Sequence, residues 1–281
     1  MKEGLLEKII LETVDVPSIP PVAAKVLQLV GHDYTSINQL ENIISQDQSF
    51  STRILKIANS PYYGRGRSVD SIATAIILIG FNSMKSLVMA ASLKDLHRAS
   101  GLFEQLHWEH SLGVSIAASL LASETKMLMP EEALIGGLIH DLGKVVINNS
   151  VPDQYSAVVD RIQSEGITSI MAEDEKFGFN HCNVGGLIAR KWKLPMNLEA
   201  VIEYHHAEQY PTFEDSYYET LCQIVQVADG MCLHLGIGMQ AAVDFSKIGF
   251  EQMGLSEAHF NALLERLQRD YTSQKGQLFG P

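Results

Sequence analysis

A histidine and an aspartate stand side by side in the apolar stretch GGLIHDLGKVVI, which covers residues 136–147. The apolar residues around them recur with the spacing of a buried helix. Burial removes the hydration of both polar groups, so an unpaired His140 and Asp141 would destabilise such a fold. The pair therefore either holds a metal ion that performs chemistry, or is what remains of such a site in a protein that binds and signals.

Helical periodicity dominates the rest of the chain, and convincing alternating strands are absent from the sequence. Pro20 and Pro21 stand where the first turn of a helix tolerates proline, and Thr35 or Ser36 is a candidate N-cap. These signals predict an array of short helices in the first third of the chain. Further helices are predicted over roughly residues 108–123, 131–148, 152–165, 181–193, 197–207, 217–236 and 256–272.

These helices predict an all-α protein with two parts, an N-terminal helical subdomain over residues 1–97 and a second helical subdomain over residues 98–281 that packs with it. Asn180 and Asn197 are placed to cap the helices that follow them, and Pro195 is placed to close a helix. The segment 237–281 matches no specific pattern, so its role is left open.

The composition restricts the partners. The formal net charge is −12, from 21 Lys+Arg against 33 Asp+Glu, which opposes broad binding to nucleic acid or to an anionic membrane. The three cysteines are odd in number and show no CxxC spacing, so neither a disulfide framework nor a thiolate zinc site is expected. The N-terminus lacks a signal-peptide core, and no apolar run approaches the roughly 20 residues of a spanning helix. We expect a cytoplasmic protein.

Two further histidines repeat the arrangement of His140. His110 and His181 each lie one turn from small residues, Gly113 and Gly185, on a predicted helix face where another helix can come close. A single histidine of this kind is more often a core residue satisfied by a carbonyl. Three of them indicate helices that converge on one polar centre.

Asp229 lies on a predicted helix face shared with Cys222, Val225 and Cys232, so the helix that buries these residues buries its carboxylate too. Its partner is an arginine, a backbone amide or a metal ion. His205 and His206 close another helix, and at least one of them must point inward, although a surface pair at a helix C-terminus is the simpler interpretation.

Imidazoles and carboxylates without a thiolate suit iron, manganese, zinc, nickel or cobalt rather than calcium or magnesium. One aspartate can bridge two cations about 3.5–4 Å apart, and water bound between them loses a proton near neutral pH. Such a hydroxide would attack a phosphorus centre.

The order of these residues resembles the HD superfamily of metal-dependent phosphohydrolases over roughly residues 98–236. The matching segments are LIHDLGK, HCNVGGLIARKWKLP, IEYHH and QIVQVAD. The segments PSIPPVAAKVLQL, IISQDQSFSTRILKIANSPYYG and SIATAIILIGFNSMKSLV resemble the narrower HDOD family, the HD-related output domains of bacterial signal transduction. The HDOD resemblance implies a regulatory module without a demonstrated activity, in which several metal ligands have been lost.

The chain departs from that family pattern because each ligand position of an HD enzyme still carries a ligand. It also differs from the HD-GYP phosphodiesterases, since the Gly-Tyr-Pro segment is missing and Leu106 stands where a third-metal carboxylate would be. By resemblance, the first metal would be held by His110, His140, Asp141 and Asp229. The second would be held by His181, His205 and His206, with Asp141 as the bridge.

The resemblance makes Lys144 the residue that faces a substrate phosphate, and in an active enzyme Lys144 and Asp141 would be catalytic. Arg190 and Lys191 are further candidates for phosphate binding. Solvated surface is the simpler interpretation of these residues, as it is of Lys193, Arg65 and Arg67.

We therefore expect a signalling HDOD protein with a pair of divalent transition-metal ions, iron or manganese first, nickel or zinc second. The alternative is an active phosphohydrolase or phosphodiesterase on a nucleotide or cyclic dinucleotide. A metal-free scaffold is the third reading, and the complete ligand set argues against it. The expected partners are signalling proteins or a small phosphorylated ligand, with no direct nucleic-acid binding and no membrane.

Overall fold

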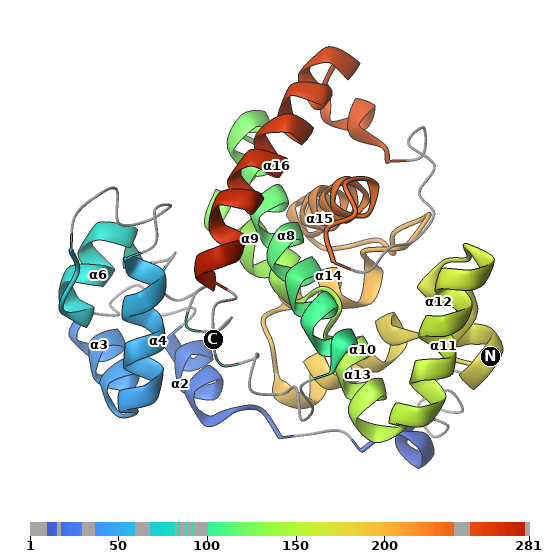
Figure 1. Cartoon of the computed structure of the whole chain (residues 1–281), viewed down its shortest axis with the longest axis horizontal. Coiled ribbons are helices and arrows are strands. Elements are labelled where there is room, and N and C mark those ends of the chain that lie inside the picture. Colours follow the sequence, from blue (N-terminus) through green and yellow to red (C-terminus); the bar gives the residue numbers. More distant parts are fainter. Residues whose placement is uncertain are drawn as a thin grey trace. The chain divides into compact units, whose positions relative to one another are not determined.

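The computed structural model describes residues 10–15, 18–29, 37–59, 68–81, 84, 88, 92, 101–238 and 248–278. Every regular element of this part of the chain is a helix, so the predicted all-α class is confirmed (Figure 1). The contacts within the chain define two units, residues 1–18 with 96–261 and residues 19–95 with 262–281. The predicted boundary near residue 97 lies outside the described residues.

In the described part of residues 19–95, four short helices pack around an apolar core. They are α2 (Pro21–Leu29), α3 (Ile37–Ser45), α4 (Gln48–Ala58) and α6 (Ile72–Ile79). α3 packs against α2, α4 and α6, and Leu40 and Ile44 are fully buried there. α2 begins at Pro21, as the proline signal predicts. The candidate caps Thr35 and Ser36 and the cations Arg65 and Arg67 lie outside the described residues.

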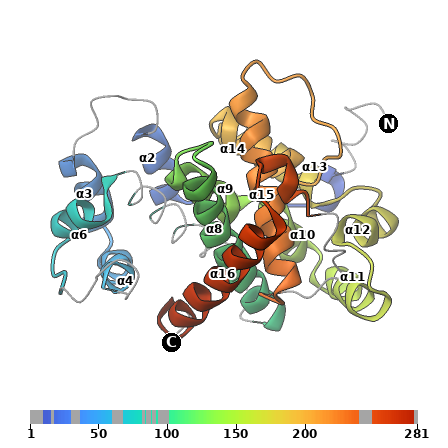
Figure 2. The ribbon, with the colours of Figure 1, turned by 90° about the horizontal axis from the view of Figure 1, so that it is seen from above.

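The larger unit carries the helices on which the sequence places the polar centre. They are α8 (Leu102–Thr125), α9 (Pro130–Ile139), α10 (Leu142–Ser150), α11 (Pro152–Glu165), α12 (Ser169–Phe177), α13 (His181–Trp192), α14 (Met196–Tyr204) and α15 (Ser216–His234). A 3-10 turn, η2 (Phe250–Met253), precedes α16 (Glu257–Leu278). α16 is divided between the units: residues 257–261 belong to the larger unit and residues 262–278 to the smaller one. α8 packs on α9 and α15, α13 packs on α10 and α14, and α11 lies beside α12 (Figure 2).

The continuous helix predicted over residues 131–148 is wrong. α9 ends at Ile139 and α10 begins at Leu142, and Asp141 leaves the helical conformation with φ −94° and ψ 18°. The buried His107 lies with its Nε2 3.3 Å from the backbone carbonyl oxygen of Asp141. His140 and Asp141 lie in this break, and both side chains are buried.

Two other local expectations have different outcomes. The Asn180 side chain accepts hydrogen bonds from the backbone amides of Cys182 and Asn183, so its predicted role as an N-cap is confirmed. Asn197 does not cap a helix, because α14 starts one residue earlier with Pro195 in the capping position. Proline needs no donor there and its fixed φ suits a helix start. α12 has no counterpart among the predicted helices.

Glycines let the helices around the polar centre touch through their backbones. A Cβ atom on Gly143 of α10 would lie 2.0 Å from the carbonyl oxygen of His181, the first residue of α13. A Cβ atom on Gly137 of α9 would lie 2.7 Å from the carbonyl oxygen of Val114 in α8. Glycine at these two positions thus lets α10 lie directly against the start of α13, and α9 directly against α8.

Two further findings bear on the expected chemistry and location. All three cysteines are buried and free, in line with the expectation of no disulfide framework. Among the described residues, no helix combines the length and the apolar character needed to cross a membrane.

We predict that Gly137→Ala lowers the free energy of unfolding by about 1–3 kcal/mol, because the new methyl group meets backbone atoms that cannot move independently. Gly136→Ala is the matched control on the same helix. Its Cβ would meet the Val225 side chain at 3.3 Å, and the gain in helix propensity of about 1 kcal/mol offsets that contact. Urea unfolding of both variants measures the difference. Equal losses in the two would contradict the backbone contact.

Candidate metal centre

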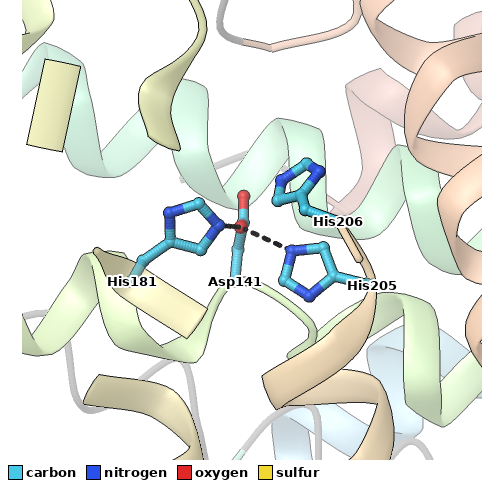
Figure 3. A group of neighbouring side chains, drawn as sticks. All are labelled: Asp141, His181, His205 and His206. Atoms are coloured by element: carbon cyan, nitrogen blue, oxygen red, sulfur yellow. Dashed lines mark ion pairs between the residues drawn. The ribbon is translucent and has the colours of Figure 1, made fainter. Parts of the chain in front are cut away.

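Two groups of potential metal ligands share Asp141. The first consists of Asp141, His181, His205 and His206, and the second consists of His110, His140 and Asp141. Within each group the ligand atoms lie within 4.8 Å of one another. Figure 3 shows the first group, in which the three imidazoles surround the Asp141 carboxylate.

The two oxygens of Asp141 face different pairs of histidines. Its Oδ1 lies 3.3 Å from Nε2 of His181 and 3.6 Å from Nε2 of His205. Its Oδ2 lies 3.4 Å from Nε2 of His140 and 3.9 Å from Nε2 of His110. A carboxylate placed in this way can contribute one oxygen to each of two neighbouring cations.

Asp229 closes the group from the side of α15. Its Oδ1 lies 2.9 Å from Nε2 of His110, and its Oδ2 lies 4.0 Å from Nδ1 of His206. The structure therefore brings together all seven residues that the sequence analysis named as metal ligands: His110, His140, Asp141, His181, His205, His206 and Asp229.

The protein fixes the orientation of the imidazoles from behind. Nδ1 of His140 lies 2.7 Å from the Gly137 carbonyl oxygen, and Nδ1 of His205 lies 2.9 Å from that of Val201. Nδ1 of His110 lies 3.2 Å from the carbonyl oxygen of Ile237. A carbonyl only accepts, so these Nδ1 atoms carry protons and each Nε2 is turned toward the carboxylates.

Three buried atoms in the middle of this group have no hydrogen-bond partner: Nε2 of His140, Oδ1 of Asp141 and Nε2 of His181. Buried polar atoms are normally paired, and these three are the atoms that a cation would bind. Nitrogen and oxygen donors without a thiolate fit a divalent transition metal. The donor set of this structure therefore fits the metal ions expected from the sequence.

Charges around the centre keep both carboxylates ionised. Burial alone would raise the pKa of Asp141, but His140 and Lys144 hold it well below its usual value. Burial would likewise raise the pKa of Asp229, and the hydrogen bond and charge of His110 lower it instead. Burial would lower the pKa of His181, whereas the Glu173 carboxylate raises it to about 9. Bound metal must therefore compete with protons at His181.

The candidate phosphate ligands have different surroundings. Lys144 is buried, and its Nζ donates to Oδ2 of Asp141 at 2.7 Å, so it is not an exposed helical lysine. Arg190 forms ion pairs with Glu199 and Glu203 in an exposed network, and Lys191 is exposed next to it on α13. The hydrogen bond to Asp141 places Lys144 directly at the centre.

Sequence reasoning missed the residues behind His181. Glu173 of α12 is fully buried, and its Oε2 lies 2.6 Å from Nδ1 of His181. Tyr155 of α11 donates its hydroxyl proton to the other oxygen of Glu173 at 2.7 Å. No ligand motif marks either residue, and the one available signal is an acidic run, EDE, at residues 173–175 ahead of His181.

The ligands differ in their exposure to solvent. The side chains of His140, His181 and His205 are fully buried, whereas 27% of the His206 side chain is exposed. His206 therefore has the most exposed side chain of the seven candidate ligands.

The chain is similar to proteins of a known family. A family model of the HDOD domain matches residues 16–208. Among curated proteins, an uncharacterized protein of Treponema pallidum (strain Nichols) is 21% identical over 193 residues, which make up 68% of this chain. The chain spans only 38% of the length of that relative.

Solved structures share the fold over nearly the whole chain. An HDOD domain protein of unknown function from Geobacter sulfurreducens is 24% identical with a TM-score of 0.84, over 100% of this chain and 99% of that one. A protein from Marinobacter aquaeolei VT8 is 16% identical with a TM-score of 0.83, over 99% of this chain and 66% of that one. A third, from Shewanella amazonensis SB2B, is 23% identical with a TM-score of 0.67, over 98% and 96%.

We predict that adding Mn²⁺ to the metal-free protein raises its melting temperature, because a ligand that binds only the folded state stabilises it. The gain is about 2.7 kcal/mol when free metal is one hundred times its Kd. Asp141→Asn removes the shared carboxylate and should abolish the shift, and Asp160→Asn, an exposed change on α11, should retain it. An equal shift in the Asp141 variant would contradict the assignment of this carboxylate.

Proposed function

Because the chain belongs to the HDOD domain family, we propose that it is a regulatory output domain of bacterial signal transduction that retains a dinuclear metal centre. The first ion is held by His110, His140, Asp141 and Asp229. The second is held by His181, His205 and His206, and Asp141 bridges the two. Iron or manganese is the expected metal, and nickel or zinc is the second choice.

One observation carries this proposal. The buried Nε2 atoms of His140 and His181 face the Asp141 carboxylate, and these two nitrogens and Oδ1 of Asp141 have no hydrogen-bond partner. Two ligands that each lie about 2.1 Å from one ion stand about 3–4 Å apart. The distances of 3.3 to 3.9 Å between Asp141 and four imidazole nitrogens fall in that range. A bound cation would satisfy these atoms together.

The overall charge of the chain and the pairing of Arg190 favour regulation over catalysis. The chain carries a net charge of −12, and the exposed Arg190 is neutralised by two glutamates. Phosphate substrates need concentrated positive charge. The fold relative from Marinobacter aquaeolei VT8 is provisionally named a signal transduction protein, which agrees with this reading. We therefore expect signalling proteins or a small phosphorylated ligand as partners, in the cytoplasm.

A phosphohydrolase or phosphodiesterase acting on a nucleotide or cyclic dinucleotide is the second candidate. The specific observation in its favour is the buried Lys144, whose ammonium group lies beside the shared carboxylate. Two bound cations would supply a hydroxide, and Lys144 would bind a phosphate oxygen next to it. The fold relative from Shewanella amazonensis SB2B is provisionally named a metal-dependent phosphohydrolase.

We predict that protein purified without added metal contains close to two transition-metal ions per chain and that His140→Ala loses most of them. His259→Ala is the matched control, because that histidine is exposed and pairs with Glu124. Elemental analysis of the three proteins measures the content. Metal far below one ion per chain in the wild type, or equal metal in His140→Ala, would overturn the proposal.

We predict no metal-dependent hydrolysis of bis-p-nitrophenyl phosphate or of cyclic dinucleotides with added iron or manganese. Release of p-nitrophenol and of linear dinucleotide is measured by absorbance and chromatography. Turnover that disappears in both His140→Ala and Lys144→Met would establish the hydrolase candidate instead. Turnover that survives His140→Ala would come from a contaminant and would leave the regulatory reading in place.

A further inference from the structure

We infer that Glu173 is a positioning residue for the metal ligand His181, that Tyr155 holds Glu173 in place, and that this pair sets the affinity of the centre for metal. The inference rests on the proposed metal centre and adds to it two residues from α11 and α12, which supply none of the ligands. Its basis is the arrangement of hydrogen bonds around the Glu173 carboxylate.

Both oxygens of Glu173 are used, and one of them binds His181 twice. Its Oε2 accepts from the backbone amide of His181 at 2.8 Å and lies 2.6 Å from Nδ1 of the same residue. Its Oε1 accepts from the Tyr155 hydroxyl at 2.7 Å. Because one oxygen holds both the backbone and the ring of His181, the side chain is fixed in one rotamer with Nε2 toward Asp141.

The carboxylate also decides which nitrogen of His181 is available. An ionised carboxylate only accepts hydrogen bonds, so Nδ1 carries a proton and Nε2 is the nitrogen that binds a metal. Nε2 lies 3.3 Å from Oδ1 of Asp141 and has no hydrogen-bond partner. The positioning residue and the metal therefore bind opposite edges of one ring.

His181 differs in this respect from the other three histidines whose Nδ1 atoms are held from behind. His110, His140 and His205 place Nδ1 on backbone carbonyl oxygens. A carbonyl orients the ring, but a charged carboxylate also makes the imidazole a stronger donor to a metal. If orientation alone were required, a neutral acceptor would serve at His181 as well.

Tyr155 supports this arrangement from a fully buried position. Its ring packs edge to face against Phe103 of α8 with the centroids 5.2 Å apart. Burial raises the pKa of the Tyr155 hydroxyl well above its usual value, and the Glu173 charge raises it further, so the hydroxyl keeps the proton it donates. The phenol therefore holds Oε1 while Oε2 holds His181.

The test compares the Co²⁺ affinity of wild type, Glu173→Gln and Tyr155→Phe above pH 9, because Glu173 raises the pKa of His181 to about 9. Above this pH, loss of the carboxylate does not change the competition from protons at that ring. The probe is Co²⁺ itself, titrated in competition with a chelator and followed by its visible absorption. Glutamine keeps the size of the side chain and an oxygen acceptor but removes the charge. Glu175→Gln is the matched control, because Glu175 lies on the same helix in an exposed ion pair with Arg161.

We expect Glu173→Gln to weaken Co²⁺ binding by about 10- to 100-fold and to alter the absorption spectrum of the bound ion. Tyr155→Phe should weaken binding by about 2- to 10-fold, since it loses one hydrogen bond to Glu173. Glu175→Gln should bind as the wild type does. Melting of the metal-free proteins checks that each variant is folded.

The outcomes separate this inference from the proposed function. If wild type and Glu173→Gln bind Co²⁺ with equal affinity, the role of Glu173 is overturned while the metal centre stands. If the wild type binds no Co²⁺ and holds no metal, the centre and the role of Glu173 both fail. If Glu173→Gln does not fold, Tyr155→Phe decides, and unchanged affinity in that folded variant overturns the inference.

Discussion

The Asp141 carboxylate is the group around which the larger unit is organised. It is buried, it faces four imidazole nitrogens with its two oxygens, and it accepts a hydrogen bond from Lys144. A lone carboxylate in this position would be strongly unfavourable, and the positive charge of Lys144 and the surrounding imidazoles offsets its burial. α8, α13 and α14 bring their histidines to the turn between α9 and α10, where this carboxylate lies.

The backbone is shaped to make this convergence feasible. His140 and Asp141 are buried in the break between α9 and α10, and Gly143 lets α10 lie directly against the first residue of α13. His205 comes from the end of α14, where its ring nitrogen bonds the carbonyl oxygen of Val201 one turn earlier. His140, Asp141, His181 and His205 thus lie at helix ends, whereas His110 and Asp229 lie within the long helices α8 and α15.

Much of the centre was accessible from the sequence, because polar residues on apolar helix faces reveal themselves by periodicity. His110, His181 and Asp229 were identified in this way, each relative to its own helix. The interruption at His140 was not, because local periodicity is the same on both sides of the turn and the break depends on tertiary contacts such as that of His107. The sequence also predicts that Asn197 is an N-cap, whereas Pro195 occupies the N-cap position of α14.

Glu173 and Tyr155 could not be predicted, for a different reason. No ligand motif marks either residue, and the two partners lie 18 residues apart in the chain. A buried carboxylate between a tyrosine and a histidine is defined only by the packing of α11, α12 and α13. Residues that hold ligands in place are therefore harder to find from a single sequence than the ligands themselves.

The unequal burial of the candidate ligands bears on how fast a metal ion could exchange. The side chain of His206 is partly exposed, while those of His140, His181 and His205 have no contact with solvent. An ion bound by such residues would enter and leave mainly when the surrounding helices open locally. Its exchange would therefore be slower than at a surface site, and the rate would report on local opening of this part of the protein.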